Sequence, residues 1–275
     1  MPFWQGDCGP TAGVPRKTIT FMGGSSSGGA YQFSNEPQAF YPAQTHQRLC
    51  EGLDPSLALR SLNFGHGGRD SFTVSRSIAT VLESRPADLV IFYGGCNDIL
   101  TSTNALTRKQ REERAAAGGV TAGFFARWTG YSRLITGLSL PFHSTEAPDG
   151  KLAPEVPLAD AEENLVRIAE AAAAAGARVL LMTEMVSGGD RGLMAEYEKM
   201  QASVADRFDH VTHFNVSAAL APYEKENLLL DRNHFNMKGA KRLAEVIAPV
   251  VAQLLELPGT PPAAPTESAA AASPP

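Results

Sequence analysis

Hydrophobic positions in this chain follow two periods in turn, and each period predicts a different kind of secondary structure. Short runs of apolar and β-branched residues predict buried strands. Such runs occur at Lys17–Met22, Leu57–Phe64, Asp88–Tyr93, Arg178–Thr183 and Val211–Asn215. Longer segments with apolar residues three or four apart predict helices, at Phe40–Leu53, Ser71–Glu83, Thr103–Ala117, Thr121–Leu138, Leu158–Ala175, Gly192–Phe208 and Met237–Leu257. This alternation favours an α/β fold, a three-layer α/β/α sandwich with a mainly parallel sheet of about five strands.

The two ends of the chain lack these periods. Residues 1–16 are rich in Gly and Pro, which is typical of a surface lead-in. Residues 258–275 consist mainly of Pro, Ala, Ser and Thr, a composition that favours disorder. The segment Pro141–Pro157 is interrupted by prolines and is predicted to be a loop. We therefore expect one folded domain at residues 17–257.

The charge and the hydrophobic runs of the chain exclude some classes of partner and location. The 275 residues carry a net charge of −5 at pH 7, and Lys and Arg are not clustered, so we expect no nucleic-acid partner. No run approaches the roughly 18 apolar residues of a membrane span. The first residues also lack the charged start and apolar run of a secretion signal. We expect a cytoplasmic chain, or the soluble part of a longer exported or anchored protein, and the sequence leaves its oligomeric state open.

The cysteines and other metal-ligand residues give no clear pattern. Cys8, Cys50 and Cys96 form neither a disulfide framework nor a metal-binding spacing. One bridge between two of them is allowed, but a reducing compartment is favoured. A metal site could be built from His66, Asp70, Asp98 and His234, although no pair of them has a dedicated ligand spacing. We therefore expect no metal.

Three of the predicted strands end in loops rich in Gly, Ser and Asn. These loops are Gly23–Gly29, Asn63–Gly68 and Gly94–Asp98. Carboxyl ends of parallel strands open on one edge of a sheet, where ligands bind, so the three loops are expected to meet there. Ser25, on the first loop, fits a nucleophile whose own N–H lies near a helix N-terminus. Asp231 and His234, three residues apart on a helical turn, would share one face, where the carboxylate can accept from one imidazole nitrogen.

Taken in order, these segments resemble the four sequence blocks of the SGNH (GDSL-type) hydrolase family. The blocks match at Gly23-Gly24-Ser25, Asn63-x-Gly65-x-x-Gly68, Gly95-Cys96-Asn97-Asp98 and Asp231-x-x-His234, and the resemblance covers roughly Lys17 to Leu257. It implies a flavodoxin-like sandwich and a serine esterase or lipase that needs no cofactor. It also implies Ser25 as nucleophile, His234 as general base and then acid, and Asp231 as the residue that orients His234. The N–H groups of Ser25 and Gly68 and the side chain of Asn97 would form the oxyanion hole.

The first block departs from the family pattern at its second position. The family usually has Asp there, and this chain has Gly24. That Asp is not the triad acid, so the implied chemistry stands, but the support of the nucleophile turn is in doubt, and Ser26 or Ser27 becomes a candidate nucleophile. The run from Gly24 to Gly28 also fits the G-x-S-x-G elbow of α/β-hydrolases, with Ser26 attacking. A phosphate-binding loop is disfavoured, because no Gly-Lys-Ser/Thr follows.

The chemistry predicts the class of substrate but not its identity. A small-molecule ester, either an acyl lipid or an acylated sugar, would acylate Ser25 and then be hydrolysed by water. The apolar content of Leu100–Pro157 indicates a pocket wall suited to an apolar acyl group. The alternatives are a catalytically weak or inactive SGNH-like binding module and an acyltransferase that acts on a carbohydrate. A flat pH–rate profile between about pH 5 and 8 would argue against a histidine base.

Overall fold

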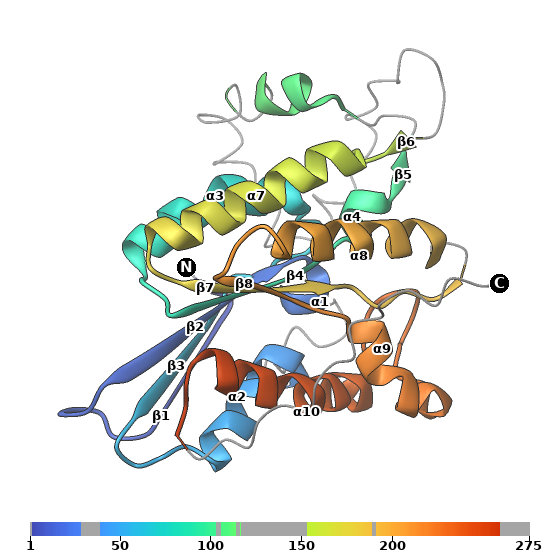
Figure 1. Ribbon diagram of the computed structural model, residues 1–275. Coiled ribbons are helices and arrows are strands. Elements are labelled where there is room, and N and C mark those ends of the chain that lie inside the picture. The colour runs from blue at the N-terminus through green and yellow to red at the C-terminus, as the bar shows by residue number, and fades with distance from the viewer. Residues whose placement is uncertain are drawn as a thin grey trace, which may run out of the picture.

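The computed structural model describes residues 2–28, 39–102, 106–113, 116, 153–188 and 191–258. Within this part, six strands form one sheet in the order β1-β3-β2-β4-β7-β8 (Figure 1). Five of them run parallel: β3 (Ala58–Asn63), β2 (Arg16–Gly23), β4 (Leu89–Gly94), β7 (Arg178–Thr183) and β8 (Val211–Phe214). The mainly parallel sheet predicted from the sequence is confirmed, with one strand more than expected.

Helices cover both faces of this sheet (Figure 1). One layer contains α3 (Ser71–Ser84), α7 (Leu158–Ala174) and α8 (Arg191–Ala205), and the other contains α2 (Tyr41–Glu51), α9 (Val216–Leu220) and α10 (Met237–Leu254). Side chains of the central strand β4 alternate between two hydrophobic cores. Val90 and Phe92 pack with the first layer, and Leu89, Ile91 and Tyr93 pack with the second. Burial on both faces is typical of a parallel strand, and the predicted α/β/α sandwich is confirmed.

The closing helix α10 shows how the sequence builds a layer. Leu243, Ile247 and Val251 recur every four residues, so they lie on one face of the helix, and all three are fully buried. Asn236 caps the start of the helix by accepting the N–H of Gly239 at 2.9 Å, an interaction worth about 1 kcal/mol. The buried face packs in the same core as α2 and the sheet. The first and last thirds of the chain are thereby joined.

The first sixteen residues, predicted to be a lead-in, contain the sixth strand. β1 (Trp4–Cys8) pairs antiparallel with β3, with Trp4 opposite Asn63 and Cys8 opposite Leu59. Its side chains alternate between half-buried and exposed positions, as expected at a sheet edge. The strand was missed because it is short, contains Gly6 and carries few apolar residues.

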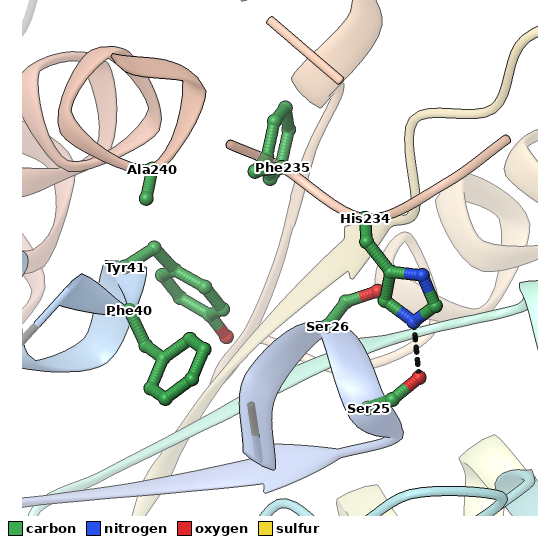
Figure 2. Close-up of a pocket in the computed structure, with 7 residues that line it drawn as sticks. All are labelled: Ser25, Ser26, Phe40, Tyr41, His234, Phe235 and Ala240. Atoms are coloured by element: carbon green, nitrogen blue, oxygen red, sulfur yellow. Dashed lines mark hydrogen bonds between the residues drawn. The ribbon is translucent and has the colours of Figure 1, made fainter. Parts of the chain in front are cut away.

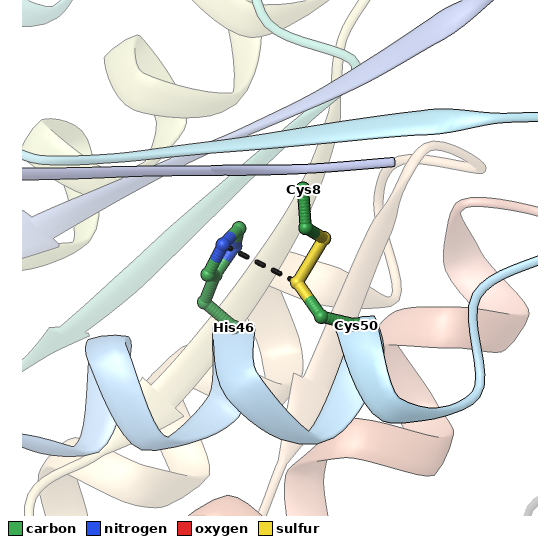
Figure 3. A group of neighbouring side chains, drawn as sticks. All are labelled: Cys8, His46 and Cys50. Atoms are coloured by element: carbon green, nitrogen blue, oxygen red, sulfur yellow. Dashed lines mark hydrogen bonds between the residues drawn. A yellow bond between two sulfur atoms is a disulfide. The ribbon is translucent and has the colours of Figure 1, made fainter. Parts of the chain in front are cut away.

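This strand is linked covalently to the layer below it. Cys8 forms a disulfide with Cys50 in the last turn of α2, and His46 lies beside the bond (Figure 3). The Cα atoms of the two cysteines are 6.0 Å apart, because the antiparallel pairing of β1 brings its end over α2. This is the single bridge that the sequence allows, although the sequence does not favour it. Cys96 is buried and takes no part in a disulfide.

The other predicted strands and helices that the structure describes differ from it mainly at their ends. Some short elements were not predicted: α9, the 3₁₀ helix η5 (Ala221–Glu226), and the strands β5 (Thr101–Ser102) and β6 (Ala153–Pro154), which pair in a second small sheet. Of the helix predicted at Thr103–Ala117, residues 108–113 are described and helical. The helix predicted at Thr121–Leu138, most of the loop Pro141–Pro157 and nearly all of the tail at 258–275 lie outside the described residues. Among the described helices, none combines the length and the apolarity that crossing a bilayer requires.

Candidate active site

Three strand ends meet at one edge of the sheet. β2 leads into α1 (Ser25–Gly28), β3 leads into a loop at 64–70, and β4 leads into α4 (Cys96–Ile99). The side chain of Asn63, the last residue of β3, donates to the Ser27 carbonyl at 2.7 Å. The N–H of His66 donates to the Gly23 carbonyl at 3.1 Å. These bonds hold the second loop against the first, as the parallel order of the strands predicts.

Ser25 lies in a hydrogen-bonded line with a histidine and an aspartate. Its Oγ is 2.7 Å from His234 Nε2 (Figure 2). The other ring nitrogen, Nδ1, is 2.8 Å from Asp231 Oδ2 and 3.0 Å from Oδ1. If Nδ1 carries the proton and donates it to the carboxylate, Nε2 faces the serine as an acceptor. Burial raises the pKa of Asp231, but hydrogen bonds from His234 and Asn233 outweigh it and leave the pKa below its usual value.

The turn that carries Asp231 and His234 differs in form from the helical turn predicted for it. Residues 231–233 form a bend, not a helix. Asp231 Oδ1 accepts the backbone N–H groups of Asn233 at 3.1 Å and of His234 at 2.9 Å. An aspartate that binds the backbone of its own turn competes with helix formation. The two side chains are still brought together, because the same carboxylate holds both the backbone and the ring of His234.

Asn97 is fixed between the second loop and the turn that carries Ser25. Its Nδ2 donates to the carbonyl of Arg69, the residue after Gly68, at 2.7 Å. Gly68 itself has φ of +76°, in the left-handed region that favours glycine. A Cβ placed on Gly24 would lie only 2.5 Å from Asn97 Nδ2. The side chain of Asn97 therefore lies near both Gly68 and Ser25.

A small pocket opens beside Ser25 in the described part of the chain. It is lined by Ser25, Ser26, Phe40, Tyr41, His234, Phe235 and Ala240 (Figure 2). The empty space amounts to about 270 Å³ and is partly open to solvent. Phe40 and Tyr41 come from the start of α2, Phe235 follows His234, and Ala240 lies on α10. The pocket thus pairs a polar end at Ser25 with an apolar wall.

The sequence matches the model of the GDSL-like lipase/acylhydrolase family over residues 19–242. The chain belongs to this family. It is therefore a hydrolase that acts on ester bonds.

Solved structures with the same fold are distant in sequence. They include Axe2, an acetylxylan esterase from Geobacillus stearothermophilus, at 19% identity and a TM-score of 0.55, with 87% of this chain and 94% of that chain covered. TesA matches at 18% identity and a TM-score of 0.54, with 86% of this chain and 99% of that chain covered. LAE5, an α/β hydrolase from the metagenome of Lake Arreo in Spain, matches at 17% identity and a TM-score of 0.55, with 87% of this chain and 95% of that chain covered. A search of the curated proteins finds no match.

The three consecutive serines that follow Gly24 in this GDSL-like hydrolase have different partners. Ser25 bonds to His234. The hydroxyl of Ser26 lies 3.5 Å from the side-chain Nδ2 of Asn233, and it lowers the pKa of the buried carboxylate of Glu184. Ser27 Oγ lies 3.1 Å from the hydroxyl of Tyr41. Ser26 and Ser27 are both buried. This geometry favours Ser25 over Ser26, the residue that would attack in an elbow of the G-x-S-x-G type.

A buried polar network beside Asn97 was not predicted from the sequence. Asp98 Oδ1 accepts the N–H of Ser71 at 3.0 Å and its hydroxyl at 2.7 Å, and Oδ2 accepts the hydroxyl of Tyr197 at 2.9 Å. Asn164 Nδ2 donates to Ser71 Oγ at 3.0 Å. Burial raises the pKa of Asp98 to about 7, although the hydrogen bonds from Ser71 act in the opposite direction. The network ties α4 to α3, α7 and α8, so it fixes the turn that carries Asn97.

The metal site considered from the sequence receives no support from the geometry. Asp70 instead caps α3 by accepting the N–H of Thr73 at 2.8 Å, and it pairs with Arg111 at 2.7 Å. In the described residues, the ligand-type side chains that converge are Cys8, His46 and Cys50. Both sulfur atoms of that group are joined in the disulfide.

Proposed function

We propose that this protein hydrolyses carboxylic esters through an acyl-enzyme on Ser25, with His234 as general base and acid and Asp231 as the residue that orients the histidine. The observation that carries the proposal is the continuous line from Ser25 Oγ to His234 Nε2 at 2.7 Å and from His234 Nδ1 to Asp231 at 2.8 Å. This arrangement gives a weak nucleophile an adjacent base, and it gives the base a fixed orientation.

In the first half-reaction, Ser25 Oγ attacks the ester carbonyl carbon while His234 Nε2 takes the hydroxyl proton. The tetrahedral intermediate collapses when His234 returns this proton to the alkoxide oxygen, and the alcohol leaves. In the second half-reaction, water attacks the acyl-enzyme with its proton going to His234. The carboxylic acid is released and Ser25 regains its proton.

The negative charge on the carbonyl oxygen requires donors in both half-reactions. We infer that they are the N–H of Ser25, the N–H of Gly68 and the side-chain amide of Asn97. Ser25 begins α1, and the first N–H groups of a helix have no carbonyl partner within it. A carboxamide has two N–H groups, so the bond from Asn97 to Arg69 uses one and leaves the other for the oxyanion.

The substrate that the site fits best is a short-chain acyl ester. The pocket beside Ser25 is small, and Phe40, Phe235 and Ala240 give it an apolar wall. Axe2, which has the same fold, is an acetylxylan esterase. We therefore propose an acetyl or similarly short acyl group, with an acylated carbohydrate as one candidate alcohol component. An acyltransferase and an inactive binding module are the alternatives that the experiment must separate.

We also infer that the protein functions in an oxidising compartment, and not in the cytoplasm expected from the sequence. The disulfide between Cys8 and Cys50 supports this inference, because such bonds are rare in reducing compartments.

The test combines an active-site label with a substrate series. Wild-type protein should react with a fluorophosphonate probe, and Ser25→Ala should abolish labelling, whereas Ser26→Ala should leave a labelled serine. Hydrolysis of p-nitrophenyl esters should decline as the acyl chain lengthens, with an acetylated sugar as a second substrate. A folded wild-type protein that is neither labelled nor active would establish the binding module. Acetate transfer to an added sugar in preference to water would establish the acyltransferase.

A further inference from the structure

Glu184 is a buried carboxylate at the active-site edge of the sheet. It directly follows Thr183, the last residue of β7, and its exposed fraction is 1%. Its backbone N–H donates to the Gly94 carbonyl at 3.2 Å, which holds it against the end of β4. A carboxylate in such a position loses its hydration, and this loss must be offset by hydrogen bonds. Burial accordingly raises the pKa of Glu184, and its bonds to Ser26 and Cys96 offset part of that effect.

The two hydrogen bonds of this carboxylate reach two different active-site turns. Oε2 accepts the backbone N–H of Cys96 at 2.7 Å. The hydroxyl of Ser26 interacts with the same carboxylate and lowers its pKa. Ser26 is the residue after Ser25, and Cys96 is the residue before Asn97. One rigid side chain therefore connects the turn that carries the nucleophile with the turn that carries the oxyanion-hole amide.

A third segment lies close to the same bridge. The side-chain Nδ2 of Asn233 is 3.5 Å from Ser26 Oγ, and Asn233 is the residue before His234. The hydroxyl of Ser26 can donate to Glu184 while it accepts from Asn233. The order of the groups is thus Asn233, Ser26, Glu184 and Cys96. The three groups around Glu184 are the chain neighbours of His234, Ser25 and Asn97.

Gly24 supports the turn through its backbone alone. Its carbonyl accepts the N–H groups of Ser27 at 3.2 Å and of Gly28 at 3.0 Å, and it has no side chain that could add a further hydrogen bond. We propose that Glu184 is a positioning residue that holds the Ser25 turn and the Asn97 turn at a fixed separation by accepting hydrogen bonds from Ser26 and Cys96. This inference rests on the proposed function, since it assigns a purpose to the bridge only if Ser25 and Asn97 act on one substrate.

The test weakens the bridge from each of its two sides. Glu184→Gln keeps one acceptor oxygen and replaces the other with a donor, so it can serve only one of the two turns. Ser26→Ala removes one arm and keeps the carboxylate. Misplacement of reacting groups by about 1 Å costs up to about 10²-fold in rate. We expect each variant to lower kcat for p-nitrophenyl acetate and the rate of fluorophosphonate labelling by about 10- to 100-fold, with KM changed less than about threefold.

The matched control is Glu198→Gln. Glu198 is also an acid whose pKa is raised by burial, and it bonds to Asn215, which has no assigned part in the proposed reaction. This variant should keep the wild-type kcat. The double variant Glu184→Gln/Ser26→Ala should be no slower than Glu184→Gln alone, because both changes break one bridge.

The outcomes separate this inference from the proposed function. If wild type is labelled and active, but Glu184→Gln and Ser26→Ala both react at the wild-type rate per folded molecule, the positioning role is refuted. A lower melting temperature with an unchanged labelling rate would mean that Glu184 only stabilises the fold, which also refutes it. If Glu184→Gln does not fold, Ser26→Ala alone decides. The proposed function fails separately, through an unlabelled wild type.

Discussion

Replacement of Gly24 by alanine should lower activity, because the added methyl group meets the amide of Asn97. An ideal Cβ at Gly24 lies 2.5 Å from Asn97 Nδ2 and 3.2 Å from the Arg69 carbonyl. Real Cβ atoms do not approach a neighbour that closely, so the amide must move. It would then lose its 2.7 Å bond to Arg69, and its other N–H would leave the position from which it can bind an oxyanion.

The size of the effect follows from this displacement. The amide must move by about 1 Å to reach ordinary contact distance, and a shift of that size can cost about 10²-fold in rate. Complete loss of one oxyanion donor costs about 10²–10³-fold. We therefore expect kcat/KM of Gly24→Ala to fall by about 10²-fold, which corresponds to about 3 kcal/mol of transition-state stabilisation.

The assay is kcat/KM for p-nitrophenyl acetate, compared with Gly67→Ala. A Cβ at Gly67 meets nothing within 4 Å, so this control adds the same methyl group on a neighbouring active-site loop and should remain fully active. Asn97→Ala should lose about 10²–10³-fold, and addition of Gly24→Ala to it should cost nothing further, since the displaced group is gone. Wild-type activity in Gly24→Ala, or additive losses in the double variant, would refute the reasoning.

Three further changes test other parts of the molecule. Asp231→Asn should lower kcat by about 10²–10⁴-fold because it removes the acceptor that orients His234; steady-state kinetics with unchanged melting temperature would verify it, and unaltered kcat would contradict it. Burial raises the pKa of Asp98 to about 7, against 3.8 in the unfolded chain. Between about pH 4 and 7 the folded protein therefore holds a proton that the unfolded chain has lost. The free energy of unfolding should fall by up to a few kcal/mol as the pH rises across that window. Urea unfolding at both ends of the window should show a smaller decline in Asp98→Asn, and an equal decline would exclude this residue. Reduction of the Cys8–Cys50 bond, which spans 42 positions, should lower the free energy of unfolding by about 4 kcal/mol, while the same reductant should leave the double Cys→Ser variant unaffected.

Much of the fold was predictable because the parallel sheet is buried on both faces. Strands such as Arg178–Thr183 appear as continuous apolar runs, and their bounds agree with β7 in the structure. β1 was missed for the opposite reason. An edge strand exposes one face, so its five residues need not be apolar, and only its antiparallel pairing with β3 identifies it.

The candidate site was predictable where function fixes the residue type. Ser25, Asp231 and His234 came from the order of motifs, and they lie within hydrogen-bonding distance in the structure. Glu184 was not predicted, although it follows a predicted strand at the same sheet edge, because a single acid at a strand end is a weak signal. Its importance depends on contacts with Ser26 and Cys96, residues far apart in the sequence. The network around Asp98 was not predicted for the same reason, since it joins residues that are far apart in the sequence.

The two residues at the centre of the site, Ser25 and His234, are separated by 209 positions in the chain. In the folded protein they are brought together by the pairing of the parallel strands and by the packing of α10 with α2 and the sheet, and contacts of such long range form slowly. During synthesis the turn that carries Ser25 emerges early, yet its hydrogen-bond partner His234 is absent until almost the whole domain has been made. Reactivity of Ser25 would therefore appear late in folding, and the time course of active-site labelling would report completion of the native structure.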